Sequence, residues 1–252
     1  MKGITKNGKV SLPFCFGEPV KIALLQTDIL HPEFRDQYQG YGLMFQQLFA
    51  RAGLTLHSEI FSVIEGVYPE HPEAFDALLV TGSKADAFSD EPWVLTLADY
   101  LRARHAAGQK LIGICFGHQL LAHALGGKAE RAEGGWGVGV MDYEWRNQPA
   151  WLKASAPAFK LICSHRDQVT RLPQGASLLA ANAFCPHAAF HIGDTVLAFQ
   201  GHPEFTPDYG QALLKKRWDD IGTERADRAM ASYRQDHDGL MVARVMADFI
   251  RH

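Results

Sequence analysis

The amino-acid sequence predicts an α/β fold in which helices flank a mostly parallel central sheet. Short runs of branched apolar residues alternate along the chain with longer segments whose apolar residues recur at helical spacing, which is the pattern of such a fold. The composition agrees, because 47% hydrophobic and 21% charged residues in a chain of 252 are ordinary for a globular protein with a sizeable core. We therefore expect three layers, with helices on both faces of the sheet.

The first half of the chain carries this alternation most clearly. VKIALLQ at 20–26 reads as a buried strand, and the segment 37–52 has large apolar residues at helical spacing before Gly53. Pro92 and Gly108 bracket a further helix. The predicted strands are 20–26, 56–63, 76–81 and 110–115, and the predicted helices are 37–52, 92–107 and 116–125.

The second half of the chain has a different texture. Short alternating segments separated by Pro, Gly and Asn turns predict a small antiparallel section, with strands at 137–143, 159–163, 177–181, 188–192 and 195–200. After these strands the chain becomes charged and helical, which predicts two or three helices. Their inward-facing positions are expected to include Leu213, Leu214, Met241, Val245 and Phe249.

No long linker, internal repeat or low-complexity tract divides the sequence. We therefore expect one compact domain over residues 18–207. An N-terminal extension at 1–17 precedes it, and a helical extension at 208–252 packs on the same domain.

The charge pattern argues against nucleic acid and membranes as partners. The net charge is -3, and no run of basic residues is longer than the pair Lys215 and Lys216. The N-terminal residues lack the apolar core of a signal peptide, and no apolar stretch approaches the roughly 20 residues of a membrane span. We predict a cytoplasmic protein whose partners are small molecules or proteins.

The cysteines and histidines do not predict a metal site. The four cysteines lie far apart without a C-x-x-C pair, so we expect reduced thiols and neither a disulfide framework nor a zinc knuckle. The twelve histidines include no H-E-x-x-H motif and no compact group with cysteine. No cofactor is predicted either.

The segment GICFGHQL, residues 113–120, joins a predicted strand to a predicted helix. In a G-x-C-x-G turn the glycines tolerate a tight bend that lifts the central side chain, here Cys115, out of the sheet. The helix N-terminus favours the thiolate, and the N–H of Phe116 would face an oxyanion on the attacked carbon. Cys115 is therefore a candidate nucleophile. The alternative is a small buried hydrophobic residue at a strand end.

A second motif, FQGHPEF at 199–205, favours the nucleophile. Residues two apart in extended backbone face the same way, so Glu204 would accept the imidazole N–H of His202 and fix the tautomer that takes a proton from Cys115. An isolated H-x-E is often only two solvated residues near a turn. Here, however, both motifs follow strand ends, where α/β sheets place their sites.

The two motifs together resemble the class I glutamine amidotransferases, whose elbow G-x-C-x-G-x-Q and distal H-P-E are both present in the same order. The resemblance implies a flavodoxin-like, three-layer amidotransferase domain over residues 18–207. It also implies that Cys115 attacks the γ-carbonyl of a glutamine-like substrate. His202 would act as base and then as acid, and Glu204 would orient it. A γ-glutamyl thioester forms and is hydrolysed by water.

The resemblance also implies an oxyanion site and a substrate pocket. One oxyanion donor is the N–H of Phe116. The other comes from a glycine-containing turn that matches VTGSK at 80–84, where Gly82 and Ser83 stand in place of the two glycines of many members. Gln119 matches the family glutamine that lines the pocket, and would otherwise be an ordinary polar residue of a first helical turn.

Two further segments bear on the pocket. SHRDQV at 164–169 resembles the S-H-x-D-x-V segment of GMP synthase amidotransferase domains, where nearby backbone grips the amino-acid end of the substrate. It makes His165 and Arg166 candidate substrate-binding residues, although His165 and Asp167 would equally cap a turn. GGWGVG at 134–139 misses the dinucleotide-binding pattern and is predicted as a glycine-rich loop at the pocket rim.

The sequence contains neither an S-G-G-x-D-S nucleotide loop nor a Walker A motif. DAFSDEPW at 86–93, with HRDQV and the helical tail, resembles stand-alone GMP-synthase-like proteins, among them the plant γ-glutamyl peptidases. This resemblance implies hydrolysis of glutamine or a γ-glutamyl peptide. Two alternatives remain: a glutaminase subunit that supplies ammonia to a separate synthetase such as a GMP synthase, and a non-catalytic binding protein on the same scaffold.

Overall fold

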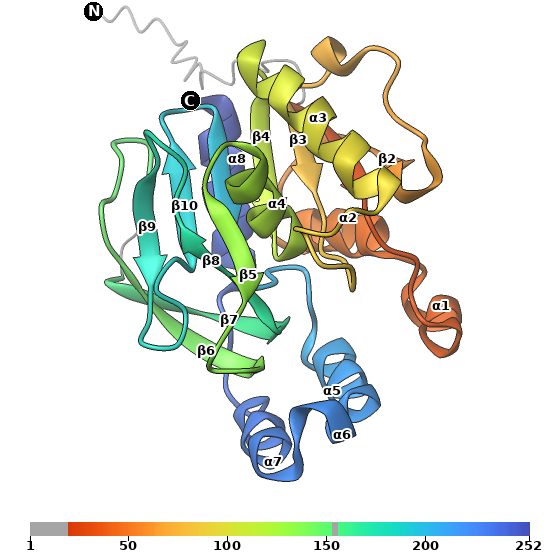
Figure 1. The fold of residues 1–252 in the computed structure, drawn as a ribbon, viewed down its shortest axis with the longest axis vertical. Helices are drawn as coiled ribbons and strands as arrows, with labels where there is room; N and C mark the ends of the chain where they lie inside the picture. Colours follow the sequence, from red (N-terminus) through yellow and green to blue (C-terminus); the bar gives the residue numbers. More distant parts are fainter. Residues whose placement is uncertain (1–19, 153–155) are drawn as a thin grey trace, which may run out of the picture.

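A computed structural model of the protein describes residues 20–152 and 156–252, so the predicted N-terminal extension at 1–17 lies outside the described residues. A large mixed sheet forms its centre (Figure 1). The strands are β1 (Val20–Gln26), β2 (Leu56–Ser62), β3 (Ala77–Val80), β4 (Lys110–Ile114), β6 (Gly137–Trp145), β7 (Ala158–His165), β9 (Ser177–Ala181), β10 (Ala189–Ile192) and β11 (Val196–Phe199). Their order across the sheet is β2-β1-β3-β4-β11-β10-β9-β6-β7.

The sheet has a parallel half and an antiparallel half, as the sequence predicts. Strands β2, β1, β3, β4 and β11 run parallel to one another. From β11 onward each neighbouring pair is antiparallel. The parallel strands β3, β4 and β11 are almost entirely buried, because helices cover both faces, and this explains their continuous apolar sequences.

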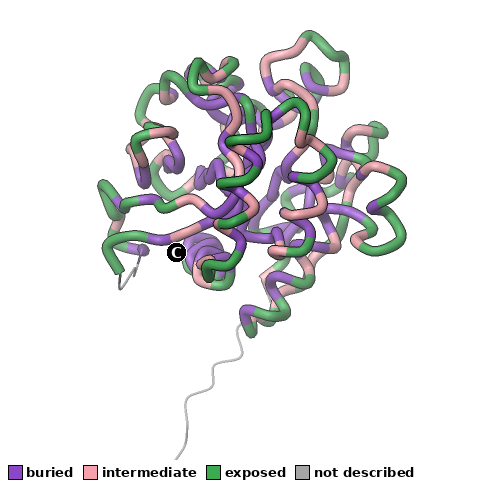
Figure 2. Tube along the Cα trace, turned by 90° about the horizontal axis from the view of Figure 1, so that it is seen from below, coloured by how far each residue is buried: buried purple, intermediate pink, exposed green. Residues whose placement is uncertain are grey.

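Helices form the two outer layers. The four that flank the sheet are α2 (Tyr41–Arg51), α3 (Pro92–Ala106), α4 (Phe116–Ala124) and α8 (Gly239–Arg251). Successive residues of β1 point to opposite faces: Ile22 and Leu24 pack with α2 and α8, whereas Ala23 and Leu25 pack with α3 and α4. Buried residues therefore concentrate through the middle of the molecule and exposed ones along its outer loops (Figure 2).

A third group of helices packs against β6 and β7. It consists of α5 (Pro207–Lys216), α6 (Trp218–Ile221) and α7 (Thr223–Ser232), which lie together beside the ends of those strands (Figure 1). The short helix α1 (Pro32–Tyr38) joins the same apolar cluster through Phe34, and two single turns of 3₁₀ helix follow β2, at Val63–Glu65 and Pro72–Ala74. No helix within the described ranges is long and apolar enough to cross a membrane.

The structure corrects the helix predicted at 37–52. The chain forms α1 and α2, separated at Gln39, which has φ 58°, and at Gly40. Gly40 packs directly on Gln26: a Cβ at this position would lie 2.6 Å from Gln26 Oε1. Gln26 Oε1 also accepts a hydrogen bond from the Gly42 N–H in the first turn of α2 at 3.0 Å, and a local apolar pattern does not reveal this distant contact.

Two strands and part of the tail also differ from the prediction. β5 (Lys128–Arg131) and β8 (Asp167–Arg171) form a separate two-stranded sheet that the sequence analysis missed, because both segments are short and polar. The tail has four helices rather than two or three, since the single-turn α6 separates α5 from α7. The inward positions Leu213, Leu214, Val245 and Phe249 are buried as predicted, and Met241 is partly buried.

Candidate functional site

Cys115 occupies a strained turn between β4 and α4. Its backbone lies at φ 53° and ψ -101°, outside the regions that non-glycine residues ordinarily adopt. Such a conformation costs on the order of 1–3 kcal/mol and persists only where the surroundings enforce it. The strain marks Cys115 as a candidate functional residue.

The two glycines of the elbow permit this turn by close approach rather than by unusual dihedral angles. A Cβ at Gly117 would lie 2.3 Å from the carbonyl oxygen of Val80, and one at Gly113 would lie 2.5 Å from the carbonyl oxygen of Gly117. Neither glycine has a positive φ, and the positive φ of the turn falls on Cys115 itself. The elbow is therefore pressed against β3 with no room for a side chain at either flank.

Backbone hydrogen bonds fix the elbow in the sheet. The Cys115 N–H donates to the carbonyl of Phe199 at 2.9 Å, which ties the elbow to the end of β11. Phe116 is the first residue of α4, and the first amides of a helix have no partner within it. The Phe116 ring stacks on Trp93, with centroids 5.5 Å apart, so the side chain packs in the core.

His202 and Glu204 form a buried hydrogen-bonded pair just after β11. His202 Nδ1 and Glu204 Oε1 are 2.7 Å apart, and the two residues are only 2% and 1% exposed. The His202 N–H donates to the carbonyl of Ile162 at 2.8 Å, and the Phe205 ring stacks on the imidazole at 3.8 Å. The pairing expected from the i, i+2 spacing is present, and the ring is held from two sides.

The electrostatics of His202 favour the charged imidazolium. Burial by itself lowers the pKa of His202, but the Glu204 carboxylate and the adjacent Cys115 outweigh it and raise this pKa to about 10. Gly82 lies close to the side chains of both His202 and Cys115: a Cβ at Gly82 would lie 2.8 Å from His202 Cε1 and 3.7 Å from Cys115 Cβ. Three features therefore lie together around Cys115: the elbow, the His202–Glu204 pair and the turn at Gly82.

His118 is close to Cys115 in sequence but does not line the pocket around it. It is fully buried beside Phe190, with ring centroids 5.3 Å apart. Burial lowers the pKa of His118 to about 3, so its ring is neutral. His118 therefore has the environment of a core residue rather than of a base.

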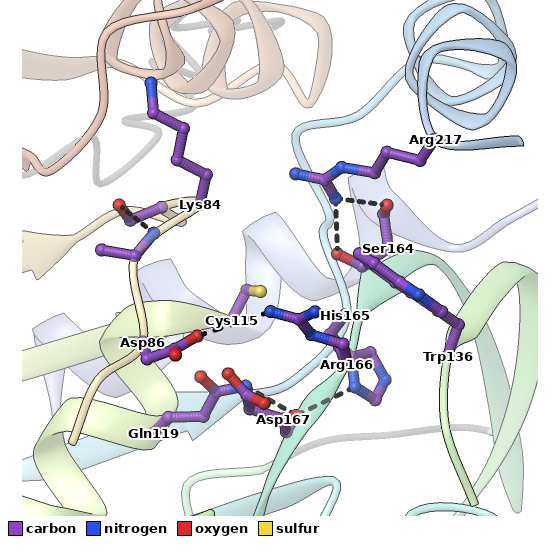
Figure 3. A pocket seen from close by; sticks show the side chains of 12 residues that line it. Lys84, Asp86, Cys115, Gln119, Trp136, Ser164, His165, Arg166, Asp167 and Arg217 are labelled. Atoms are coloured by element: carbon purple, nitrogen blue, oxygen red, sulfur yellow. Dashed lines mark hydrogen bonds and ion pairs between the residues drawn. The ribbon is translucent and has the colours of Figure 1, made fainter. Parts of the chain in front are cut away.

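Cys115 opens into a polar pocket (Figure 3). The lining residues come from five separate regions of the chain: Ser83, Lys84, Ala85 and Asp86 after β3; Cys115 and Gln119 at the elbow; Trp136 before β6; Ser164, His165, Arg166 and Asp167 at the β7–β8 turn; and Arg217 after α5. Four of the predicted substrate-binding residues line this pocket, namely Ser83, Gln119, His165 and Arg166. Gly82 and Phe116 adjoin it through the turn and the elbow.

Gln119 is oriented by a buried network. Its side-chain nitrogen donates to the carbonyl of Asp167 at 2.8 Å and to Gln200 Oε1 at 3.1 Å. Both amide protons are thereby used, which leaves the Gln119 carbonyl oxygen as the group free to accept a bond from a ligand. The network connects the elbow to the β7–β8 turn.

His165 and Arg166 differ in their surroundings. His165 is buried, its Nδ1 lies 3.1 Å from the carbonyl of Asp167, and burial lowers its pKa to about 4, so the ring is neutral. Arg166 is exposed, with its guanidinium 3.9 Å from Asp86 and above the ring of Trp136. Both residues therefore line the pocket: His165 as a buried neutral ring and Arg166 as an exposed cation at the rim.

The carboxylates of the pocket lie close to each other. Asp167 is buried and adjacent to Asp86, and burial together with that neighbour raises the pKa of Asp167 to about 6. Arg131 opposes this shift through ion pairs of 2.6 Å to Asp167 and 3.0 Å to Asp86. No group of three or more His, Cys, Asp or Glu side chains within the described ranges is arranged to hold a metal ion.

Sequence reasoning did not identify Arg217 as a residue of the pocket. Arg217 donates from Nη1 to Ser164 Oγ at 2.8 Å and lies 5.3 Å from the centroid of the Trp136 ring. It forms no ion pair with a carboxylate within residues 20–152 and 156–252. Nothing in the charged tail distinguishes Arg217 from its neighbours, whereas Trp136 lies in the glycine-rich segment predicted to form the rim.

The fold and the site define a class of α/β protein that carries a cysteine on a strand–helix elbow beside a buried His–Glu pair. Comparison with known proteins gives the family: the chain belongs to the class I glutamine amidotransferases, whose family model matches residues 71–220.

Two curated relatives and one solved structure agree with this assignment. The chain is 35% identical to γ-glutamyl peptidase 4 of Arabidopsis thaliana over 178 residues, which is 68% of this chain and 70% of the relative. It is 32% identical to γ-glutamyl peptidase 3 of the same plant over 179 residues, with 68% and 71% covered. A glutamine amidotransferase from Thermotoga maritima has the same fold, with TM-score 0.73 at 14% identity over 93% of this chain and 98% of that one.

Proposed function

We propose that the protein hydrolyses a γ-glutamyl amide, either glutamine or a γ-glutamyl peptide, with Cys115 as nucleophile and His202 and Glu204 as its partners. The observation that carries the proposal is the strained Cys115 at the floor of a polar pocket, beside a buried His202–Glu204 pair. The names of the two plant relatives support γ-glutamyl peptides as the substrate class.

The reaction proceeds by acyl transfer in two halves. The Cys115 thiolate attacks the γ-carbonyl carbon, and the electron pair of the C=O bond moves to the oxygen. When the tetrahedral intermediate collapses, the C–N bond breaks and the leaving amine takes a proton from the His202 imidazolium. Water then attacks the thioester while His202 removes its proton, the C–S bond breaks, and glutamate leaves with the thiolate restored.

The charges of the pocket suit the amino-acid end of a γ-glutamyl group. Arg217 presents a guanidinium without a carboxylate partner among the described residues, and a charge-assisted bond to the substrate carboxylate satisfies it. The Gln119 carbonyl oxygen is free to accept a bond from the substrate ammonium. These two contacts fix the γ-carbonyl relative to Cys115.

Labelling and release assays together test the proposal. The purified chain is treated with 6-diazo-5-oxo-norleucine, a glutamine-shaped electrophile, and the adduct is mapped by mass spectrometry. In parallel, the chain alone is assayed for release of glutamate from glutamine and from γ-glutamyl peptides. We expect an adduct on Cys115, release by the lone chain, and loss of both in Cys115→Ser.

Cys185→Ser is the matched control. Burial raises the pKa of Cys185 to about 12, so it is not a nucleophile near neutral pH and its replacement leaves labelling and release intact. Labelling of Cys115 without turnover contradicts the hydrolase and favours a glutaminase subunit that needs a synthetase. The absence of labelling favours a binding protein on the same scaffold.

A further inference from the structure

Two buried threonines lie behind the turn at Gly82. Thr27 follows β1 and Thr81 follows β3, and both are fully buried. Thr27 Oγ1 lies 2.8 Å from the carbonyl oxygen of Gly82, 3.1 Å from that of Thr81 and 3.0 Å from Thr81 Oγ1. The Thr27 N–H donates to Thr81 Oγ1 at 3.1 Å. The backbone at Gly82 is therefore held by side chains rather than by a sheet ladder.

A hydroxyl carries one proton, so these contacts cannot all be donated by Thr27. The shortest is the contact to the Gly82 carbonyl, which makes it the natural acceptor. The Thr81 hydroxyl accepts from the Thr27 N–H and has its own proton free for Thr27 Oγ1 or for the Gly82 carbonyl at 3.2 Å. The Gly82 carbonyl thus points to the Thr27 side of the turn.

The direction of this carbonyl sets the direction of the next amide. In a planar trans peptide the C=O and the following N–H point in opposite directions, and the described residues contain no cis peptide. β3 lies between β1 and β4 in the sheet, so Thr27 and Cys115 lie on opposite sides of the turn that follows β3. A Gly82 carbonyl directed to Thr27 therefore directs the Ser83 N–H toward Cys115.

The amides of the two residues that follow Ser83 are occupied. The Lys84 N–H donates to Asp28 at 3.2 Å, and the Ala85 N–H donates to Ser83 Oγ at 3.2 Å. The Ser83 N–H has no hydrogen-bond partner within residues 20–152 and 156–252. On the elbow side, the Gly117 N–H donates to the Thr81 carbonyl at 3.2 Å, which locks the turn to the elbow.

We propose that Thr27 is a positioning residue for the oxyanion site, because its hydroxyl holds the Gly82–Ser83 peptide with the Ser83 N–H directed at the tetrahedral oxygen formed on Cys115. The inference rests on the proposed function. Thr27 does not line the pocket, so it acts through the Gly82–Ser83 peptide and not by direct contact. Its hydroxyl keeps the donor in place before substrate binds, so the peptide does not have to reorient during the reaction.

The test compares Thr27→Val, which removes the hydroxyl at nearly constant volume, with Thr27→Ser, which keeps it. Loss of an oxyanion donor costs at most about 10²–10³ in kcat, so we expect Thr27→Val to lower kcat by about 10- to 100-fold with KM little changed. Thr27→Ser is expected to stay near the parent. Thr195→Val, which removes a hydroxyl bonded to the Ile192 carbonyl at a turn before β11, controls for the loss of any turn hydroxyl.

A second readout separates the oxyanion site from the nucleophile. Cys115 is alkylated either with iodoacetamide or with a chloromethyl ketone analogue of glutamine, whose ketone oxygen occupies the oxyanion position. In both reactions a C–S bond forms and halide leaves. The preference is the ratio of the chloroketone rate to the iodoacetamide rate. We expect Thr27→Val to lower this ratio by about 10-fold or more, with the iodoacetamide rate unchanged.

The outcomes distinguish this inference from the proposed function. A parent protein that prefers the chloroketone, with the same preference in Thr27→Val, overturns the role of Thr27 alone. A parent without any preference for the glutamine-shaped probe overturns both. A fall in the iodoacetamide rate that equals the fall in the chloroketone rate assigns Thr27 a general structural role and also contradicts the proposal.

Discussion

The elbow at residues 113–117 and the pocket rim formed by Lys84, Asp86, Trp136, Arg166 and Arg217 are held by different forces. At the elbow, backbone packs directly on backbone, so that a Cβ added at Gly117 would lie only 2.3 Å from the Val80 carbonyl oxygen. At the rim, long side chains meet through stacking and partly exposed ion pairs, such as the 3.9 Å pair of Arg166 and Asp86.

This difference has a functional meaning. Backbone packing of this kind has few alternative arrangements, so the reacting sulfur is fixed with little freedom. Exposed ion pairs contribute little stability, so under the proposed function we expect the rim to act on substrate binding rather than on the position of the sulfur. We therefore expect changes in or next to the elbow to affect kcat or folding, and changes at the rim to affect KM.

Glu204→Gln is expected to have the largest effect, because it removes the charge that holds His202 as imidazolium. We predict a fall in kcat of roughly 10²- to 10⁴-fold with the fold retained, by analogy with the orienting carboxylate of other triads. Steady-state kinetics and circular dichroism measure the two quantities. A variant as active as the parent removes Glu204 from the mechanism.

The same variant has a distinct pH signature. The pKa of His202 is raised to about 10, so the imidazolium persists at neutral pH and kcat falls as the pH rises through that value. Without the Glu204 charge, the alkaline limb moves to lower pH by roughly 1 to 3 units. Because the folded-state pKa is raised, the pair stabilises the fold fully below the unfolded value near 6.5 and loses this contribution as the pH approaches 10. If the alkaline limb of the kcat profile does not move in Glu204→Gln, the assignment of His202 as the proton donor is contradicted.

Gly117→Ala tests the backbone packing of the elbow. The added Cβ meets the carbonyl oxygen of Val80, which is a backbone atom and cannot move aside as a flexible side chain could. We therefore predict a loss of about 1–3 kcal/mol in the free energy of unfolding. Denaturant unfolding measures it. Gly134→Ala is the control, because its Cβ meets only the ring of Phe184 at 3.1 Å, and a smaller loss is expected. Equal losses would show that the elbow is no more tightly packed than a surface loop.

Arg217→Ala is expected to have the smallest effect and to act on KM. Loss of one charge-assisted bond to a substrate carboxylate corresponds to a rise in KM of roughly 10- to 100-fold, with kcat changed much less. Arg228→Ala is the matched control, because Arg228 pairs with Glu224 on α7 and does not line the pocket. If the two variants give the same KM, Arg217 does not bind substrate.

The same contrast explains which features the sequence predicts. The elbow and the His202–Glu204 pair depend on local geometry, namely a strand that runs into a helix and a spacing of two residues in extended backbone, and the structure contains both. The parallel and antiparallel halves of the sheet follow from the apolar patterns of their strands.

Features that depend on distant contacts were not predictable in this way. The break between α1 and α2 lies where Gly40 and the Gly42 N–H meet the side chain of Gln26, and the separate pairing of β5 with β8 joins two polar segments far apart in the chain. Arg217 reaches the pocket only because α5 packs against β7, so no local pattern identifies it. The roles of Thr27 and Ser83 likewise depend on the order of strands in the sheet.

In the proposed reaction, Cys115 carries the γ-glutamyl group during turnover. The most direct measurement is intact-protein mass spectrometry after rapid acid quenching of the chain with a γ-glutamyl peptide, followed by mapping of the modified peptide. We expect a γ-glutamyl thioester on Cys115 that is absent in Cys115→Ser and accumulates when hydrolysis of the thioester is slowed. Turnover without an acyl adduct on Cys115, or with the adduct on Cys163 or Cys185, would contradict it.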